Sequence, residues 1–299
     1  MSIYSSAYPD FTSHSIPTST SPSVNIHTLI SPSSTKPPLL LIHGFPQNNL
    51  IWHLIAPHLL PHYTLIIPDL RGYGQSDKPP AGENHANYAK SAMASDMAAL
   101  MTHLGHEKFY VCGHDRGGRV AHKLCVDYPE RVRKVMMLDI CPTLAMYEKT
   151  NMAFASAYWH WFFLIQPSPV PETFMVQNPR VWFQQKKYEG VANEEVLESY
   201  VKCVADRETA RGMCEDYRAA ATVDLEEQRE DKERGRKIRC PVKVVWGREG
   251  VIEKMFDAVG EWRGVSEGVV EGEVVDCGHF IPEERPEVLG KCILEFFKE

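Results

Sequence analysis

The chain has 299 residues, and its 32 Lys and Arg against 39 Asp and Glu give a formal net charge of -7. Hydrophobic residues make up 43% and charged residues 24% of the sequence, which is typical of a globular protein and excludes a disordered chain or a small disulfide scaffold. The acidic balance, without a basic stripe, argues against nucleic acid as a partner, because phosphate neutralisation needs clustered Lys and Arg.

The eight cysteines are widely spread and include no C-x-x-C pair. Their spacing predicts reduced, mostly buried thiols and gives no sign of a zinc site or a redox dithiol. Residues 1–22 lack a basic segment followed by an apolar run, and no apolar run approaches the roughly 20 residues that cross a bilayer. We therefore expect a cytoplasmic protein with no membrane partner.

Strand and helix patterns alternate along most of the chain. Short apolar runs predict strands over 24–30, 38–42, 63–67, 108–112, 135–138, 242–246 and 269–275. Helices are predicted over 50–60, 93–104, 118–126, 252–262 and 286–297, the second of them with apolar residues on a 3.6-residue period. This alternation predicts an α/β protein with a mostly parallel sheet covered on both faces. The Ser/Pro-rich start is expected to be either disordered or an edge strand.

Residues 142–236 interrupt the alternation. They contain an aromatic-rich run at 158–163, a Pro-rich stretch and several helical segments. We predict a core domain made of 1–141 and 237–299, with 142–236 inserted as a helical cap over the carboxyl edge of the sheet. The charged run 226–237 is expected to be a solvated helix face.

Residues 110–119 form the most informative segment, a strand that runs into a glycine-rich turn and then a helix. This is the setting of a nucleophile elbow, in which a strained turn exposes its central side chain at the start of a helix. The central residue is Asp115, and the helix N-terminus favours its ionised, nucleophilic form. The alternative is an Asp that merely caps the helix.

A second segment, 264–268, has the letter pattern G-x-S-x-G of serine hydrolases. A helix is predicted before it and a strand after it, which reverses the order that a nucleophile elbow requires. We therefore expect Ser266 to lie in an exposed turn and not to be a nucleophile.

The turn His43-Gly44-Phe45-Pro46 follows the first central strand. Beside an elbow, the backbone N–H groups of Phe45 and Arg116 are placed to converge on one oxygen of Asp115 and to stabilise the charge that develops there. On its own, the same turn is also compatible with an ordinary tight turn after a strand.

A covalent aspartyl ester needs a base that activates water. Of the 13 histidines, His279 is the best candidate, because it follows the last strand and precedes the last helix, at the same sheet edge as Asp115. Asp139 ends a strand directly and is our choice for the carboxylate that orients His279, whereas Glu249 is the rival and needs a longer excursion.

Together, these features resemble the α/β-hydrolase superfamily with an aspartate nucleophile, which includes dehalogenases and soluble epoxide hydrolases. Within that group, the sequence looks like the haloacetate (fluoroacetate) dehalogenases from about Leu40 to Phe297. Four segments carry this likeness: GHDRGGR at 113–119, LDI at 138–140, YWHWFFLIQP at 158–167 and CEDYRAA at 214–220.

The resemblance implies a hydrolytic dehalogenation in which Asp115 displaces halide from a haloacetate and His279, oriented by Asp139, activates water to release glycolate. Arg116 and Arg119 lie three residues apart, on one helix face, and would bind the substrate carboxylate. The roles of the remaining residues follow from the resemblance alone: His160, Trp161 and Tyr217 would bind halide, and Phe45 would shape the pocket wall.

The resemblance also implies that no metal or organic cofactor is needed and that the chain forms a homodimer. The alignment of residues 181–191, including Trp182, stays open, and so do the preferred halogen and the substrate size.

Two other functions remain to be weighed. A soluble epoxide hydrolase would use the same Asp, His and Asp, but such enzymes usually carry an aromatic residue in place of Arg116 and need two cap tyrosines, of which only Tyr217 lies in a recognisable motif. A non-catalytic binding protein of the same fold would have no need of an intact nucleophile, base and acid.

Overall fold

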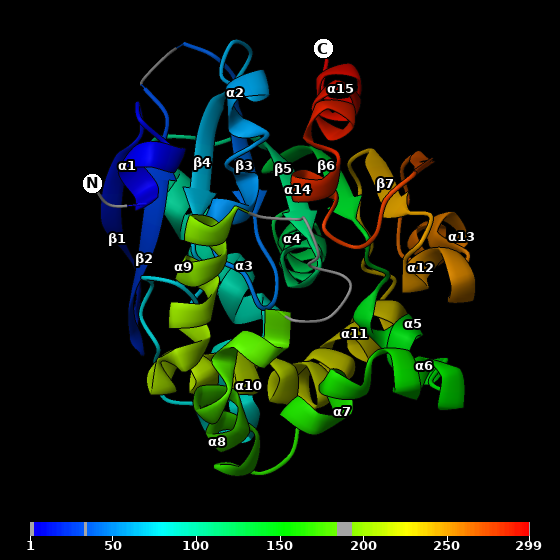
Figure 1. Ribbon diagram of the computed structural model, residues 1–299. Coiled ribbons are helices and arrows are strands. Elements are labelled where there is room, and N and C mark those ends of the chain that lie inside the picture. Colours follow the sequence, from blue (N-terminus) through cyan, green and yellow to red (C-terminus); the bar gives the residue numbers. More distant parts are fainter. Residues whose placement is uncertain (1–2, 33–34, 184–192, 299) are drawn as a thin grey trace.

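The structure is a computed structural model that describes residues 3–32, 35–183 and 193–298. Within these residues, eight strands form one sheet in the order β1-β2-β4-β3-β5-β6-β7-β8 (Figure 1). Their bounds are β1 Thr12–Thr20, β2 Ser23–Ile30, β3 Pro38–Ile42, β4 Thr64–Pro68, β5 Phe109–His114, β6 Val132–Leu138, β7 Val242–Gly247 and β8 Val270–Val275. The pairs β1–β2 and β2–β4 are antiparallel, and the other pairs are parallel. The predicted α/β fold with a mostly parallel, helix-flanked sheet is therefore confirmed.

Burial explains which segments became strands. The central strands β3, β4 and β5 are buried along almost their whole length, as continuous apolar runs require when helices cover both faces of a parallel sheet. In contrast, β1 buries only Ile16 among its nine residues. Its polar side chains suit the open edge of the sheet, so the Ser/Pro-rich segment forms the edge strand that was one of its two expected states.

Strand register brings the carboxyl ends of the parallel strands together. Ile42 of β3 lies opposite Gly113 of β5, and Leu138 of β6 pairs with both His114 of β5 and Val245 of β7. The residues that follow these strands therefore emerge at one edge of the sheet. That edge is where ligands bind in open α/β sheets.

The helices that alternate with the strands are α1 Ile3–Ala7, η1 Asn49–Trp52, α2 Ala56–Leu59, η2 Glu83–Tyr88, α3 Lys90–His103, α4 Arg116–Asp127, α12 Val251–Met255, α13 Ala258–Gly264, α14 Ile281–Glu284 and α15 Pro286–Phe296. Two predicted helices are split. The helix expected over 50–60 is the 3-10 turn η1 followed by α2, and the one expected over 252–262 breaks at Phe256. There the backbone is extended, and the Asp257 side chain caps a new helix by accepting from the Gly260 N–H.

Between β6 and β7 the chain forms helices only, within the described residues: α5 Thr143–Glu148, α6 Met152–Ala157, α7 Trp159–Leu164, α8 Val170–Gln177, η3 Pro179–Phe183, α9 Glu194–Ala205, α10 Arg207–Ala221 and α11 Val223–Glu233. In Figure 1, α7 to α11 gather beyond one end of the sheet. Helix α10 is central to this group, because it packs on α7, α8, α9 and α11 and also on η2 of the alternating part. The domain boundaries at 141/142 and 236/237 stay a prediction.

One local expectation was wrong. Ser266 does not lie in an exposed turn: it is buried and forms an isolated parallel bridge with Ile238. The charged run 226–237 is mostly exposed, as expected of a solvated helix face. Asp231 is an exception: it is buried and forms ion pairs with Lys123 (3.0 Å) and Arg236.

The eight cysteines are free thiols, and all but Cys203 are buried. Among the described helices, none has the length and apolar character needed to span a bilayer.

The elbow depends on a close approach of α4 to β3 that only glycine allows. A Cβ on Gly117 would lie 2.2 Å from the Ile42 carbonyl oxygen and 2.5 Å from that of His43. The first oxygen belongs to β3 and the second to the turn that follows it, so neither can move aside without displacing the backbone. By comparison, a Cβ on Gly264, at the end of α13, would meet nothing within 4 Å.

We expect Gly117→Ala to lower the free energy of unfolding by about 2 kcal/mol or more, because the added methyl group forces α4 away from the sheet. The matched variant Gly264→Ala should be neutral or slightly stabilising. Urea unfolding followed by circular dichroism measures both. Equal stability of the two variants would contradict this account of the packing.

A buried carboxyl group joins the inserted helices to the rest of the chain. Glu283 of α14 accepts hydrogen bonds from the Tyr200 hydroxyl of α9 (2.8 Å) and from the Gln47 amide (2.9 Å). Burial raises the pKa of Glu283 to about 8, although both hydrogen bonds oppose that rise. Between its ordinary pKa and about 8, the folded protein therefore holds a proton that the unfolded chain has released, and stability falls as pH rises through this window.

We expect Glu283→Gln, which is neutral at every pH, to be more stable than the wild type at pH 8.5 by about 2 kcal/mol. The difference should shrink towards pH 5, where Glu283 is protonated in the folded protein. Urea unfolding at both pH values tests this. Glu287→Gln, on the exposed surface of α15, is the control and should show no comparable pH-dependent gain. A pH-independent effect of Glu283→Gln would refute the linkage.

Candidate active site

Asp115 occupies the strained position that the elbow pattern predicts. Its φ of 51° and ψ of -114° lie outside the regions that most L residues adopt, and α4 begins at the next residue. The Asp115 side chain makes no capping hydrogen bond to α4, so the alternative of a simple helix cap does not describe it. A Cβ on Gly44 would lie 2.6 Å from Oδ1 of Asp115, which shows how closely the turn after β3 approaches the carboxylate.

One of the two expected backbone donors reaches this carboxylate. The Phe45 N–H donates to Oδ1 of Asp115 over 3.0 Å. Within the described residues, the Arg116 N–H makes no hydrogen bond to Asp115, because the carboxylate is turned towards the β3 turn. Oδ1 is therefore held by an amide, whereas Oδ2 has no such partner.

His279 lies between two carboxylates. Its Nδ1 is 2.5 Å from Oδ2 of Asp139, and its Nε2 is 3.8 Å from Oδ2 of Asp115. Asp139 is fully buried, and its other oxygen accepts from the Gly247 N–H (2.9 Å). The structure thus brings Asp115, His279 and Asp139 together. It leaves Glu249 exposed at the protein surface.

The electrostatic surroundings favour an ionised Asp115. Burial opposes ionisation, but His279, Arg116 and Arg119 together lower the pKa of Asp115 below its usual value. His114 itself stays neutral, because burial lowers its pKa to about 3. With its ring 4.7 Å from that of His279, it donates from Nε2 to the His279 carbonyl (2.8 Å) and so fixes the loop that carries His279. Sequence reasoning missed this role, although His114 stands inside the elbow motif.

The two arginines that follow Asp115 have different surroundings. Arg119 is buried, yet its Nε and Nη1 have no hydrogen-bond partner, and only Nη2 contacts a polar atom, the Met146 sulfur (3.4 Å). Burial and the nearby Arg116 lower the pKa of Arg119. A buried guanidinium with free N–H groups costs several kcal/mol unless an anion binds it, so the surroundings of Arg119 are suited to an anionic ligand.

Arg116 is already paired. Its Nε and Nη2 donate to the two carboxylate oxygens of Asp216 in α10 (2.9 and 2.7 Å), and Nη2 also donates to the Asp216 carbonyl (2.7 Å). Only Nη1 is buried without a partner. Binding of a substrate carboxylate by both arginines stays a prediction, in which Arg116 would contribute Nη1 and Arg119 would contribute Nε and Nη1. Asp216 was overlooked in the sequence, although it lies inside the CEDYRAA segment, directly before Tyr217.

The predicted halide-binding residues surround the same arginines. The Tyr217 ring packs 4.1 Å from the Arg116 guanidinium, and the Trp161 ring packs 4.3 Å from that of Arg119. The indole N–H of Trp161 is buried and has no partner. His160 stacks on Phe45 with 5.9 Å between ring centroids, and Phe45 contacts Tyr217 at 5.1 Å. The four aromatic residues named in advance thus form one cluster.

Phe45 also packs edge-on against Trp182, with 6.0 Å between the ring centroids. This places Trp182, whose alignment was left open, beside the aromatic cluster. Residues 184–191 of the same uncertain stretch lie outside the described residues.

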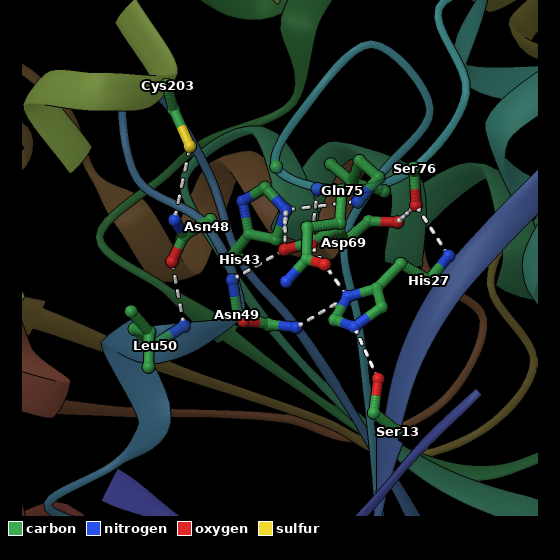
Figure 2. A network of polar contacts seen from close by, with 12 residues as sticks. Ser13, His27, His43, Asn48, Asn49, Leu50, Asp69, Gln75, Ser76 and Cys203 are labelled. Atoms are coloured by element: carbon green, nitrogen blue, oxygen red, sulfur yellow. Dashed lines mark hydrogen bonds and ion pairs between the residues drawn. The ribbon is translucent and has the colours of Figure 1, made fainter. Parts of the chain in front are cut away.

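A buried network supports the turn that carries Phe45 (Figure 2). The Asp69 carboxylate accepts from the backbone N–H groups of Asn49 and Gln75 (both 2.9 Å) and contacts His27 Nδ1 at 3.0 Å. Next to it, His43 accepts from the Leu70 N–H (3.0 Å) and donates to the Gly44 carbonyl (3.0 Å). Burial lowers the pKa of His43, which keeps the ring neutral and suited to both bonds. These hydrogen bonds hold the turn that carries Phe45 in place.

Comparison with known proteins agrees with this geometry. A family model described as the alpha/beta hydrolase fold matches residues 37–286. A fluoroacetate dehalogenase of Burkholderia sp. is 39% identical over 269 residues, which cover 88% of each chain. A soluble epoxide hydrolase of Corynebacterium sp. is 31% identical, over 87% of this chain and 90% of the relative.

Solved structures show the same fold. An α/β-hydrolase-type crystal structure from Nostoc sp. PCC 7120 superposes with a TM-score of 0.91 and 41% sequence identity, over 97% of this chain and 99% of the other. The family match, the relatives and the arrangement around Asp115 lead to the same conclusion: the chain belongs to the α/β-hydrolase family.

Proposed function

We propose that this protein is a haloacetate dehalogenase that converts a haloacetate to glycolate and halide through an ester on Asp115. Arg119 is the observation that carries the proposal: it is a buried guanidinium with unpartnered Nε and Nη1, one helical turn beyond Asp115. A carboxylate-bearing substrate would supply the anion that Arg119 lacks. A neutral substrate would leave this cation buried and unpaired.

In the first step, Oδ2 of Asp115 would attack the carbon that bears the halogen. Oδ2 is the better candidate, because Oδ1 is held by the Phe45 N–H. The new C–O bond forms as the carbon–halogen bond breaks, and the electron pair leaves with the halide. The indole N–H of Trp161 has no partner and lies beside Arg119, so it suits the departing ion, with Tyr217 and His160 in the same cluster.

In the second step, water would hydrolyse the ester at the Asp115 carbonyl carbon. His279 Nε2, at 3.8 Å from Oδ2 of Asp115, leaves room for a small displacement or a water molecule, and it would take the proton from that water. Negative charge then develops on Oδ1, where the Phe45 N–H stabilises it. Asp139 would hold the His279 ring in position and stabilise its charged form.

The rival function is epoxide hydrolysis, which the 31% identical relative represents. Both reactions use an aspartyl ester and a His base. They differ in the charge of the substrate: a haloacetate has a carboxylate that Arg119 can bind, whereas an epoxide is neutral. The buried guanidinium therefore favours the haloacid.

The direct test supplies purified protein with fluoroacetate, chloroacetate and styrene oxide, and follows halide release and diol formation separately. Fluoride or chloride release without diol would support the proposal and would rank the leaving groups. Diol without halide would establish the epoxide hydrolase, and a lack of any product would reject both reactions.

The two steps can be separated by variants. Asp115→Asn should abolish halide release, because the amide is a poor nucleophile. His279→Asn should still be alkylated but should not turn over, so that intact-protein mass spectrometry finds a glycolyl adduct on Asp115 after incubation with chloroacetate. Wild-type turnover by either variant would disprove the assigned roles.

The assignment of Asp139, and not Glu249, as the carboxylate that orients His279 can be tested. Asp139→Asn should lower kcat by about 10⁴-fold, because the amide no longer fixes the His279 tautomer and charge. Glu249→Gln, which changes an exposed carboxylate, should stay within about twofold of the wild type. Steady-state halide release measures both, and a larger loss in Glu249→Gln would reverse the assignment.

A further inference from the structure

We propose that Asp216 is a positioning residue that keeps Arg116 away from the nucleophile Asp115 and leaves only its Nη1 for the substrate carboxylate. This proposal rests on the proposed function for its kinetic test. Asp216 itself touches no reacting atom in the scheme above, so its effect would pass entirely through Arg116.

The contacts of Asp216 leave Arg116 little freedom. The Asp216 carboxylate binds Nε and Nη2 of Arg116 side-on, and its carbonyl oxygen accepts a third bond from Nη2. The Tyr217 ring covers one face of the same guanidinium at 4.1 Å. Because both partners lie in α10, this helix fixes Arg116 from two directions. A planar guanidinium held in this way presents its remaining amino group in a defined direction.

The charges around Asp216 are balanced without Arg119. Lys90 forms ion pairs with Asp216 and, at 3.4 Å, with Asp224. Two cations, Arg116 and Lys90, thus face two anions, and all four side chains are buried. Burial opposes the ionisation of Asp216, yet Arg116 and Lys90 hold its pKa well below the usual range. Arg119 is then the cation left for an incoming carboxylate.

Without Asp216, Arg116 would lose the carboxylate that pairs with it. Arg116 directly follows Asp115, and its charge already lowers the pKa of that carboxyl. A buried guanidinium that loses its partner is stabilised by pairing with another anion, and we expect Asp115 to become that anion. Such a pair would occupy the oxygen that attacks the substrate, and the nucleophile would be masked although every catalytic group is still present.

The kinetic test compares two proteins that both carry His279→Asn, one with and one without Asp216→Asn. Adduct formation on Asp115 with chloroacetate is followed in each. We expect the rate constant at saturating substrate to fall at least about 100-fold, with a rise of no more than about threefold in the half-saturating concentration. If Asp216 acted only through its negative charge, its removal would tighten binding of the anionic substrate and leave the rate constant unchanged. That result would overturn the proposal.

A double-mutant cycle identifies the route of the effect. In an Arg116→Met background, Asp216→Asn should change the adduct rate by less than about threefold, because Arg116 is no longer there to be misplaced. A full additional loss in that background would contradict the proposal. If Asp216→Asn does not fold, Arg116→Lys replaces it, since Lys cannot span both carboxylate oxygens and should show the same loss of rate constant.

Arg211→Met is the matched control. Arg211 also links α10 to the rest of the chain, through the carbonyl groups of Pro79 and Lys78 (3.0 and 2.7 Å), but it does not contact Arg116. If Asp216 served only to tie α10 in place, Arg211→Met would show a similar loss. We expect it to keep the adduct rate within about threefold of its parent.

A crystal structure of Asp216→Asn separates this proposal from the proposed function. We expect the Arg116 guanidinium to bond to the Asp115 carboxylate in that variant. If the wild-type protein releases halide from no haloacetate, the proposed function fails, and this structure alone decides the role of Asp216. An Arg116 guanidinium that keeps its wild-type place, bonded to the substituted side chain at position 216, would overturn the positioning role.

Discussion

The rest of the site depends on the close approach of α4 to the central sheet. Gly117 permits that approach, because any side chain at this position would meet backbone oxygens of β3 and its following turn. The approach holds Asp115 in a left-handed conformation at the end of β5 and brings its Oδ1 to the Phe45 N–H. Backbone strain at Asp115 is thus maintained by the surrounding packing, which is how strained residues at functional sites usually persist.

A second constraint is the balance of buried charge. Several ionisable groups lie within a few contacts of Asp115, and each needs a partner in a medium that solvates charge poorly. Asp216 and Asp224 balance Arg116 and Lys90, Asp139 pairs with His279, and Arg119 is left with free N–H groups. Arg119 is therefore the group to which the proposed function assigns an anionic ligand. Helix α10 takes part in the same balance of charge, since it supplies Asp216 as well as the Tyr217 ring that packs on Arg116.

Much of the site could be read from local sequence, because its key residues lie at the ends of recognisable strands. The apolar run before Asp115 and the glycines after it define the elbow, and Asp139 and the His279 loop follow later strands of the same parallel sheet. Parallel strands bring their carboxyl ends to one edge, so chain position was sufficient to place these residues together. Contacts across the sequence were harder to foresee. Asp216 is 100 residues from Arg116, and no pattern in either segment indicates that the two side chains bond.

By itself, the sequence determined the alternating fold and the positions of Asp115 in the elbow and His279 at the same sheet edge, because hydrophobic periodicity and glycine turns are local properties of the chain. Only the tertiary structure decided which carboxylate contacts His279, which arginine keeps free N–H groups, and where Trp182 packs. It also decided that Ser266 is buried and that two predicted helices break. All of these depend on which distant groups meet in a buried space, where a single hydrogen bond or ion pair determines whether a polar side chain is satisfied.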